Sequence, residues 1–373
     1  MKKLINKMKL TSNLLKINNY LEIDKKIAII NKEDKSYLFI YNNSINKNSK
    51  VFEFCDKTLK TDVMVSIENF DSFIKLLELS ENFDIYLDDK DNFTIKTESS
   101  KMSFATSHIS RKNNSDFYNI FDNEVNILEK NIGNEKIQIL DLIDILTKAI
   151  KICSNDLSKP KMSKIFVESN DNNLKIIATD AFILYKKELN LNLFQKGEFL
   201  FDKIEIENFI KFLKKQDKKI NVKIDIKDNI LYFKVNNENY YFKSVGSNYI
   251  SYQVILPTNS ELKNDYKSCS FDKKYFNKVL KKAKITISKD APIMITNFKN
   301  ETLKTNDEKS NQTIQLKPIK NEIIFNDDIG LSLKYVELIL KLIKSKEIDI
   351  EIKDNENVIL VNDEFIIMSM DLS

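Results

Sequence analysis

The amino-acid sequence predicts an α+β fold of three similar domains, each with two helices and antiparallel sheets. The first observation is a strand, turn, strand pattern that occurs three times, in Phe83–Asn92, Ile220–Asn229 and Lys346–Asn355. Each copy alternates apolar and polar residues, as half-buried strands do, and ends in Lys-Asp-Asn, which favours a turn. The second observation is a helical pattern before each copy, and the third is a weaker version of the whole unit before that pattern.

Helices are predicted in six places. Before the three strand patterns, apolar residues recur with the period of a helix in Phe70–Leu77, Phe209–Leu213 and Tyr335–Ile343. The weaker units begin with helical stretches of the same kind at Leu10–Leu21, Ile139–Ile150 and Phe271–Ala283. The chain is therefore built from six half-units, two in each domain.

Domain boundaries follow from the interruptions between these units. At 373 residues the chain is longer than one ordinary hydrophobic core supports. Polar residues interrupt the patterning near Glu124–Gly133, and proline with polar residues interrupts it near Pro257–Lys263. We therefore expect three domains, at residues 1–127, 128–257 and 258–373.

Composition narrows the class of protein. Hydrophobic residues make up 42% and charged residues 31% of the chain, which is a globular balance. Met1–Leu10 contains lysines, but no apolar run of signal-peptide length follows it. The most apolar helical stretch, Tyr335–Ile343, contains Glu337 and Lys341, so we expect no segment that crosses a membrane. The three cysteines are far apart, which fits neither a disulfide framework nor a metal site and suits a cytoplasmic protein.

Catalysis is not expected, because the residue types that enzymes use are scarce. His108 is the only histidine, so a histidine-based triad or metal cluster has at most one candidate. The chain has 4 glycines, too few for a glycine-rich phosphate loop. Asp180 lies in a predicted turn between two strands, where a structural role is the better interpretation. We expect no catalytic residue, no cofactor and no metal ion.

Four short segments, one within the predicted second domain and the others toward predicted domain ends, carry a family resemblance. Ile177–Leu184 reads IATDAFIL, similar to Ala-Thr-Asp-Gly-His-Arg-Leu, and Tyr249–Pro257 reads YISYQVILP, similar to Phe-Pro-Asp-Tyr-Arg-Arg-Val-Leu-Pro. Asp116–Asn119, DFYN, resembles the counterpart of that second segment, and Ile366–Leu372, IIMSMDL, resembles Val-Val-Met-Pro-Met-Arg-Leu. Each motif is weak alone, but with their order and the triplicated unit the chain resembles the bacterial DNA polymerase III beta subunit (beta sliding clamp) family. The resemblance covers essentially the whole chain and is thinnest before residue 60.

The resemblance implies a ring and a function for that ring. Two chains joined head-to-tail would form a ring of six domains with twelve helices facing inward. Helices about 10 Å wide, side by side, give a circumference of roughly 120 Å and a clear diameter of roughly 28 Å. A DNA duplex passes loosely through such an opening. The implied function is to encircle duplex DNA without reading its sequence and to tether the replicative polymerase for processive synthesis.

Lysines on the helical stretches are candidates for contact with DNA phosphates. The net charge of +4 decides little by itself, because the position of each lysine carries the information. The predicted DNA-facing residues are Lys16, Lys25, Lys26, Lys75, Lys148, Lys151, Lys159, Lys211, Lys215, Lys278, Lys281 and Lys282. An ordinary solvated helix face accounts for any single lysine equally well, because acidic residues share these stretches, so only the set is predicted.

The resemblance also implies a hydrophobic cleft between the second and third domains, where short peptides of the polymerase and the clamp loader bind. Carried over by position, its lining is Met162, Thr179, Ala181, Ile183, Leu184, Ile250, Val254, Ile255, Met368, Ser369, Met370 and Leu372. Flexible methionines suit a site with several partners, although core packing is the alternative for each residue. Ile183, Val254 and Asp371 stand where the family has arginine. We therefore expect a less positive cleft that takes a more apolar peptide or a private set of partners.

The contact between two chains is implied at Met102 and Phe104 on one side and at Ile285 and Ile287 on the other. Two other classes of protein stay open. One is an interaction scaffold of the same fold that neither closes a ring nor binds DNA. The other is a metal-dependent DNA-processing enzyme, which would need several carboxylates at strand ends, and their spacing singles out none. The expected partners are double-stranded DNA, polymerase and clamp-loader subunits and a second copy of the chain, with no membrane.

Overall fold

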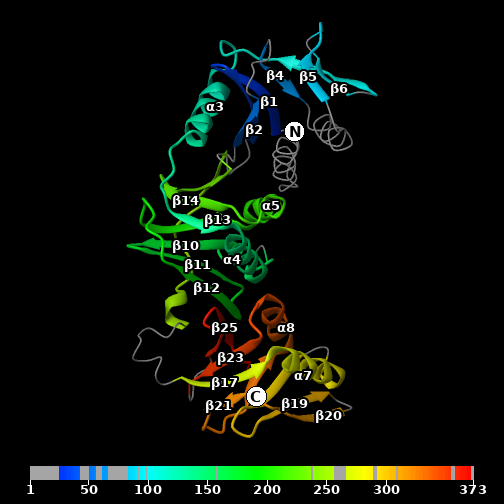
Figure 1. Ribbon diagram of the computed structural model, residues 1–373, viewed down its shortest axis with the longest axis vertical. Coiled ribbons are helices and arrows are strands. Elements are labelled where there is room, and N and C mark those ends of the chain that lie inside the picture. Colours follow the sequence, from blue (N-terminus) through cyan, green and yellow to red (C-terminus); the bar gives the residue numbers. More distant parts are fainter. Residues whose placement is uncertain are drawn as a thin grey trace. The chain divides into compact units, whose positions relative to one another are not determined.

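The computed structural model describes residues 25–42, 50–55, 61–65, 83–90, 92–97, 99–156, 158–236, 238–255, 266–288, 292–307, 310–353 and 358–370. The chain divides into two compact units, and its elements are labelled in Figure 1. Unit 1 comprises Met1–Ile143, Leu193–Gln195 and Ile204–Lys243, and unit 2 comprises Asp144–Asn192, Lys196–Lys203 and Ser244–Ser373. No helix among the described residues combines the length and the apolar composition that a membrane crossing requires.

Unit 1 contains a five-stranded antiparallel sheet with the strand order β3-β2-β1-β4-β8. Its strands are β1 (Lys25–Lys32), β2 (Lys35–Asn42), β3 (Lys50–Cys55), β4 (Val63–Val65) and β8 (Thr106–His108). β1 and β2 form a tight hairpin in which Lys32 is paired with Lys35. All residues from Ile27 to Ile30 are buried, so both faces of this hairpin are covered.

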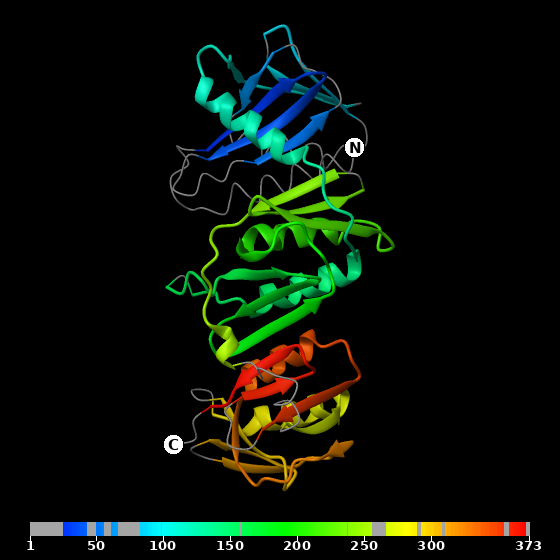
Figure 2. The same cartoon turned by 90° about the vertical axis from the view of Figure 1, so that its left-hand side faces the viewer.

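The helix α3 (Ser115–Leu128) packs against this sheet and lies across its strands in Figure 2. Its buried side chains Tyr118, Phe121 and Val125 recur every three or four residues and join one core cluster with sheet residues such as Phe39. The sequence predicts no helix here. Three asparagines, which are poor helix formers, occupy exposed positions of α3 and weaken the pattern.

Two further sheets belong to unit 1. Their strand orders are β5-β6-β7 and β16-β15-β14-β9. Their strands are β5 (Phe83–Leu87), β6 (Phe93–Thr97), β7 (Lys101–Phe104), β9 (Lys136–Gln138), β14 (Asn221–Lys227), β15 (Ile230–Val235) and β16 (Glu238–Lys243). Helix α5 (Lys203–Leu213) packs on the second sheet through Phe209, whose ring centroid lies 4.9 Å from that of Phe233 and 5.2 Å from that of Phe242.

Unit 2 is organised around a nine-stranded sheet with the order β13-β10-β11-β12-β25-β24-β23-β17-β21. Its strands are β10 (Lys164–Asn170), β11 (Asn173–Thr179), β12 (Ile183–Leu189), β13 (Gly197–Asp202), β17 (Lys267–Asp272), β21 (Lys320–Asn321), β23 (Glu347–Ile352), β24 (Val358–Val361) and β25 (Phe365–Met368). The pairs Ile183↔Ile367, Leu184↔Ile366 and Tyr185↔Phe365 join β12 to β25. Strands from distant parts of the sequence therefore form one continuous sheet.

A smaller sheet and several helices accompany the large sheet. The smaller sheet has the order β20-β19-β18-β22, with β18 (Ile293–Asn297), β19 (Thr302–Asp307), β20 (Ser310–Gln315) and β22 (Ile329–Ser332). The helices are α4 (Ile139–Ile152), α7 (Lys273–Thr286), α8 (Leu333–Leu342) and the 3-10 helix η2 (Tyr252–Ile255). Asp272 caps α7, because its carboxylate accepts a hydrogen bond of 2.7 Å from the backbone N–H of Tyr275.

The predicted α+β class and its strand repeat are confirmed in the described part of the chain. The strand, turn, strand pattern is present in three copies, as β5–β6, β14–β15 and β23–β24. In the second copy Asp228 and Asn229 have φ angles of 53° and 59°, a left-handed turn geometry that Asp and Asn tolerate. Four predicted helices correspond to α4, α5, α7 and α8. The helices predicted at Leu10–Leu21 and Phe70–Leu77 lie outside the described residues.

Candidate binding surfaces

An apolar cluster in unit 2 contains part of the predicted cleft. Its buried members are Phe166, Ile177, Leu184, Leu200, Tyr249, Tyr252, Leu360 and Ile366. The rings of Phe166 and Tyr249 stack with centroids 4.8 Å apart and planes 5° apart. Ile250, Tyr266 and Val358 pack against the cluster and stay partly exposed. Leu184 and Ile250, both predicted lining residues, therefore belong to one apolar cluster, in which Leu184 is buried and Ile250 is partly exposed.

Ile183 does not belong to this apolar cluster. It is the neighbour of Leu184 in β12, and successive side chains of a strand point to opposite faces of the sheet. Ile183 is only 2% exposed and is paired with Ile367, which lies on that other face. Ile183 is therefore a core residue. Core packing was the alternative interpretation for each predicted lining residue.

The remaining predicted lining residues lie on turns and strand ends. Met162, Met368, Ser369 and Met370 are partly exposed, Ala181 is exposed and Thr179 is buried. The backbone N–H of Met370 donates a hydrogen bond of 2.9 Å to the carbonyl of Gly330, which anchors the segment after β25. Val254 and Ile255 lie in η2 with side chains outside the described set, and Leu372 lies outside the described residues.

Sequence reasoning missed the aromatic members of the apolar cluster. Tyr249 and Tyr252 lie within the segment whose motif resemblance was recognised, but only its aliphatic residues were assigned to the lining. The hydroxyl of Tyr252 donates a hydrogen bond to Glu168, which also pairs with Lys175 at 3.0 Å. The two tyrosines of this apolar segment are the signal that could have indicated them, because large aromatic rings contribute much of the buried contact area.

The turn between β11 and β12 is held by its own side chains. The hydroxyl of Thr179 donates to the carbonyl of Ile183 at 2.7 Å and accepts from the N–H of Ala181 at 3.1 Å. One carboxylate oxygen of Asp180 accepts from the N–H groups of Phe182 and Ile183, at 3.0 and 3.1 Å. Ala181 has a φ of 88°. Asp180 therefore has the structural role that its place in a turn indicated.

The other oxygen of Asp180 ties this turn to α8. It accepts a hydrogen bond of 2.9 Å from the hydroxyl of Tyr335. Burial and this carboxylate raise the pKa of Tyr335 above its ordinary value, so the hydroxyl stays protonated and donates. The ring of Phe182 stacks on that of Tyr335, with centroids 6.2 Å apart. The turn thus has a fixed position within unit 2.

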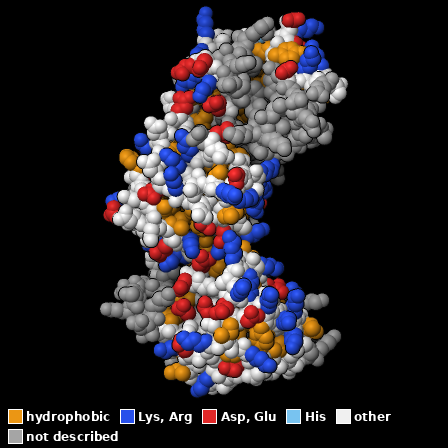
Figure 3. Space-filling view, in the orientation of Figure 1, with side chains coloured by type: hydrophobic (Ala, Val, Ile, Leu, Met, Phe, Trp, Pro, Cys, Tyr) orange, Lys and Arg blue, Asp and Glu red, His pale blue; other side chains and the backbone are white. Residues whose placement is uncertain are grey.

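Most of the predicted DNA-facing lysines that the structure describes are exposed. Six have exposed side chains: Lys151, Lys211, Lys215, Lys278, Lys281 and Lys282. α7 contains six lysines and no acidic residue, whereas α4, α5 and α8 each contain acidic residues. In Figure 3 acidic side chains lie among lysines on the visible face. Lys16 and Lys75 lie outside the described residues, and only the backbone of Lys25 and Lys26, in β1, is described.

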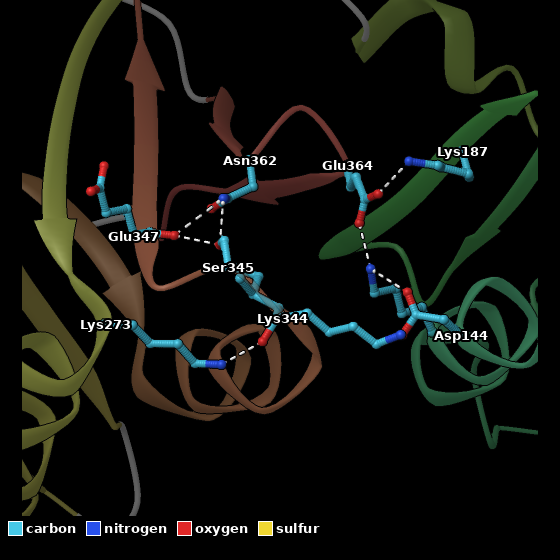
Figure 4. A network of polar contacts seen from close by, with 10 residues as sticks. Asp144, Lys187, Lys273, Lys344, Ser345, Glu347, Asn362 and Glu364 are labelled. Carbon is cyan, nitrogen blue, oxygen red and sulfur yellow. Dashed lines mark hydrogen bonds and ion pairs between the residues drawn. The ribbon is translucent and has the colours of Figure 1, made fainter. Parts of the chain in front are cut away.

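Lys159 is partly exposed, and Lys148 is buried in an ion-pair network, whose members Asp144, Glu364 and Lys187 are labelled in Figure 4. Its side chain is 7% exposed, and its ammonium contacts Glu364 at 2.7 Å and Asp144 at 2.9 Å. Glu364 also pairs with Lys187 at 2.6 Å, and Asp144 with Lys344 at 3.1 Å. Burial lowers the pKa of Lys148, but the hydrogen bonds to both carboxylates outweigh it and raise the pKa. Lys148 is committed to carboxylates within unit 2.

Two of the residues predicted for contact between chains are exposed, and two are buried. Met102 on β7 is 43% exposed and Ile285 near the end of α7 is 81% exposed. Phe104 and Ile287 are buried at 5% and 8% exposure. β7 and β20 are edge strands of their sheets among the described strands. An edge strand presents unpaired backbone groups that another chain can pair with.

Cys153 and His108 are two other side chains with chemically reactive groups. Cys153 is buried, its thiol lies 3.3 Å from the carbonyl of Lys164, and burial raises its pKa to about 12. His108 is exposed in β8. Across the described ranges, no group of three or more His, Cys, Asp and Glu side chains is arranged to hold a metal ion.

Comparison with known proteins identifies the fold. No protein-family model and no curated protein sequence matches the chain. Solved structures match over nearly its full length. The DNA polymerase III beta subunit from Thermotoga maritima has a TM-score of 0.74 at 15% identity, with 99% of this chain and 97% of that chain covered. The sliding clamp from Bacillus subtilis has a TM-score of 0.68 at 14% identity, and the beta subunit from Borrelia burgdorferi, in complex with a natural product, has 0.69 at 15%; each covers 100% of this chain and 98% of the other. The chain has the fold of the beta sliding clamps, as its motifs indicated.

Proposed function

We propose that this protein is a DNA sliding clamp, which encircles duplex DNA and tethers a replicative polymerase for processive synthesis. The observation that carries the proposal is the full-length likeness to beta sliding clamps, with at least 97% of each compared chain covered. The threefold strand, turn, strand repeat supports it, because a ring needs similar units in succession.

The proposed ring contains two chains, each with domains at residues 1–127, 128–257 and 258–373. Its closure joins an edge strand of the first domain, β7, to an edge strand of the third, β20. Met102 and Ile285 are exposed and supply apolar contacts at the two edges. Phe104 and Ile287 are buried, so in this proposal they stabilise those edges from within each chain.

DNA contact is assigned to the exposed lysines of the helices. Lys278, Lys281 and Lys282 are the strongest candidates, because α7 carries no acidic residue that would neutralise them. Such contacts bind phosphates of any sequence and are weakened by salt. Lys148 is left out of this set, because its ammonium already pairs with two carboxylates.

Partner proteins are proposed to bind at the apolar cluster of unit 2. The partly exposed Ile250, Met368 and Met370 would contact a short apolar peptide of a polymerase or clamp-loader subunit. Methionine side chains repack easily, which suits a site that takes several peptides. The proposed activity needs no catalysis and takes place in the cytoplasm, where these partners replicate DNA.

The experiment that tests the function combines the mass of the protein with its retention on circular DNA. Light scattering is expected to give twice the 43.7 kDa mass of one chain. Protein loaded on nicked circular DNA by a clamp loader should stay bound in high salt and be lost when the DNA is cut to linear form, because linkage rather than affinity retains it.

The matched control is Ile285→Glu, which puts a charge at the proposed chain contact and leaves the exposed surface otherwise unchanged. We expect this variant to be monomeric and to be washed off circular DNA by salt. A wild-type protein that is strictly monomeric at micromolar concentration, or that stays on DNA after linearisation, would favour a scaffold over a clamp.

A further inference from the structure

We infer that Phe182, with Lys159 and Lys334, is a specificity determinant beside the proposed peptide site and selects peptides with acidic residues next to their apolar residues. This role rests on the proposed function, because it defines which partner peptides the site takes. The sequence predicts a more apolar peptide or a private set of partners, since three arginines of the family pattern are missing. Positive charge is instead supplied from elements outside those motifs.

Phe182 is exposed on a turn that cannot easily rearrange. Its side chain is 46% exposed, while its own N–H donates to Asp180 at 3.0 Å. Its carbonyl accepts a hydrogen bond of 2.9 Å from the N–H of Met368. The backbone of Phe182 is therefore fixed next to Met368 at the end of β25, one of the proposed peptide contacts, and the stack on Tyr335 positions its ring. A peptide lying on Met368 would reach Phe182.

Two lysine ammonium groups lie beside the aromatic pair. The Nζ atom of Lys159 is 5.9 Å from the ring centroid of Phe182, and that of Lys334 is 5.1 Å from the centroid of Tyr335. Both distances are within the range of a cation–π contact. Lys159 comes from the segment after α4 and Lys334 from the first turn of α8. Unit 2 thus brings one cation to each ring of the stacked pair, Lys159 to the exposed Phe182 and Lys334 to the buried Tyr335.

These two cations are not held in close ion pairs, although hydrogen bonds from Ser158 and, after them, the charge of Lys159 lower the pKa of Asp156. Among the residues that the structure describes, neither ammonium forms an ion pair within 4 Å. Asp180, which contacts Tyr335, already accepts hydrogen bonds at both oxygens. A cation–π contact uses the face of a ring and leaves ammonium protons free to bind an anion. The site is therefore complementary to an acidic side chain that follows an apolar one.

A peptide fits this surface better than a nucleic acid does. Stacking of a base requires a free aromatic face. Phe182 already makes two face contacts, with Tyr335 and with the ammonium of Lys159. Phe182 is 46% exposed and its backbone adjoins that of Met368, so a peptide on Met368 has an exposed apolar ring within reach. The occupant we assign is an apolar peptide segment flanked by glutamate or aspartate.

The test measures binding of two fluorescent nine-residue peptides to the full-length protein. Both contain the same leucine and phenylalanine residues, flanked by three glutamates in one and by three glutamines in the other. At low salt the glutamate peptide should bind roughly threefold to tenfold more tightly, as expected for two exposed ion pairs. The double variant Lys159→Met, Lys334→Met should remove this difference, while the matched double variant Lys299→Met, Lys317→Met, also at exposed lysines, should keep it.

Phe182→Ala should weaken both peptides by a similar factor, because it removes apolar contact and leaves the lysines. Equal binding of the two peptides to the wild-type protein would overturn the inference and leave the sliding clamp intact. Absence of binding by both peptides together with failure to load on circular DNA would overturn the function itself. Binding of a labelled fifteen-nucleotide oligothymidine that Phe182→Ala abolishes would assign the surface to nucleic acid instead.

Discussion

Ala181 has a backbone conformation that alanine rarely adopts. Its φ of 88° lies in a region of backbone conformation where a Cβ atom causes strain. Glycine, which has no Cβ atom, adopts this conformation without strain. The turn persists because Thr179 and Asp180 hold the surrounding N–H and carbonyl groups. Strain of this kind costs about 1 to 3 kcal/mol and is kept only where neighbouring contacts over-determine the geometry.

Replacing Ala181 by glycine is expected to raise the free energy of unfolding by about 1 kcal/mol, because relief of strain exceeds the entropy that glycine adds to the unfolded chain. Denaturant unfolding measures the change. The control is Ala178→Gly in β11, a fully buried site with no positive φ, which should lower stability. A loss of stability in both variants would mean that Ala181 is not strained.

Lys148 shows how the solvent exposure of a charged side chain can be predicted wrongly from sequence. Its position on a predicted helix suggests a solvated lysine, but Asp144 on the same helix and the long-range partner Glu364 together make its burial tolerable. Lys148→Met is expected to lower the free energy of unfolding by about 2 kcal/mol, because two carboxylates lose their shared cation. Lys151→Met, at an exposed lysine of the same helix, should change it by less than about 0.5 kcal/mol. Thermal unfolding of both variants compares these effects.

The placement of the predicted binding residues also depends on whether a local motif or long-range packing positions them. Leu184 and Ile250 converge as predicted, because both lie in motifs whose place in the fold a resemblance can carry. Ile183 does not, since strand alternation turns it to the opposite face from Leu184. The grouping of Phe182, Lys159 and Lys334 could not be predicted, because these residues meet only when separate elements pack together.

At the scale of elements, local periodicity predicts the helices and the hairpin whose signals lie within short windows. It does not predict elements or strand pairings that depend on residues far apart in the sequence. α4, α5, α7 and α8 and the hairpin β14–β15 follow from spacing and turn chemistry within short windows. α3 escaped prediction, because its apolar face is recognisable only with the sheet that it covers. The pairing of β12 with β25 has no local signal, although motifs at both strands pointed to one site.

The stabilising effect of Asp122 in α3 is expected to depend on pH. Arg111 donates two hydrogen bonds to Asp122, at 2.6 and 3.2 Å, and this contact lowers the pKa of Asp122 below its ordinary value of 3.8. A carboxyl group with a lowered pKa in the folded state stabilises the protein above its unfolded pKa and loses that effect as the pH falls through its folded pKa.

Asp122→Asn should therefore lower the free energy of unfolding by about 0.5 to 1 kcal/mol at pH 7, and the difference from wild type should shrink below about pH 4. Melting temperatures measured between pH 7 and pH 3 give the comparison. A difference that is constant with pH would exclude the charge as its cause.

At the scale of the whole molecule, the uneven distribution of positive charge predicts where DNA affinity comes from. α7 alone among the described helices has lysines without acidic residues. The triple variant Lys278→Met, Lys281→Met, Lys282→Met should reduce the slope of log affinity against log salt by about 1 to 3 for linear duplex DNA. Fluorescence anisotropy at several salt concentrations measures the slope.

The control for this experiment is the triple variant Lys299→Met, Lys317→Met, Lys320→Met, at exposed lysines outside the helices and outside the predicted DNA-facing set. It should change the slope by less than one. Both proteins should bind duplexes of unrelated sequence equally, because phosphate contacts carry no sequence information. A triple variant with an unchanged slope would mean that DNA contacts lie on other elements.

The continuous sheet of unit 2 has a consequence for the synthesis of the protein on the ribosome. β12 emerges early, but its neighbour β25 follows only after about 180 further residues, which take roughly 10 to 40 s to translate. During that time Ile183, Leu184 and Tyr185 form an unprotected edge, which is a site for aggregation. Lys186 and Lys187 follow directly in the same strand, and such charges discourage misplaced pairing until the last strand arrives.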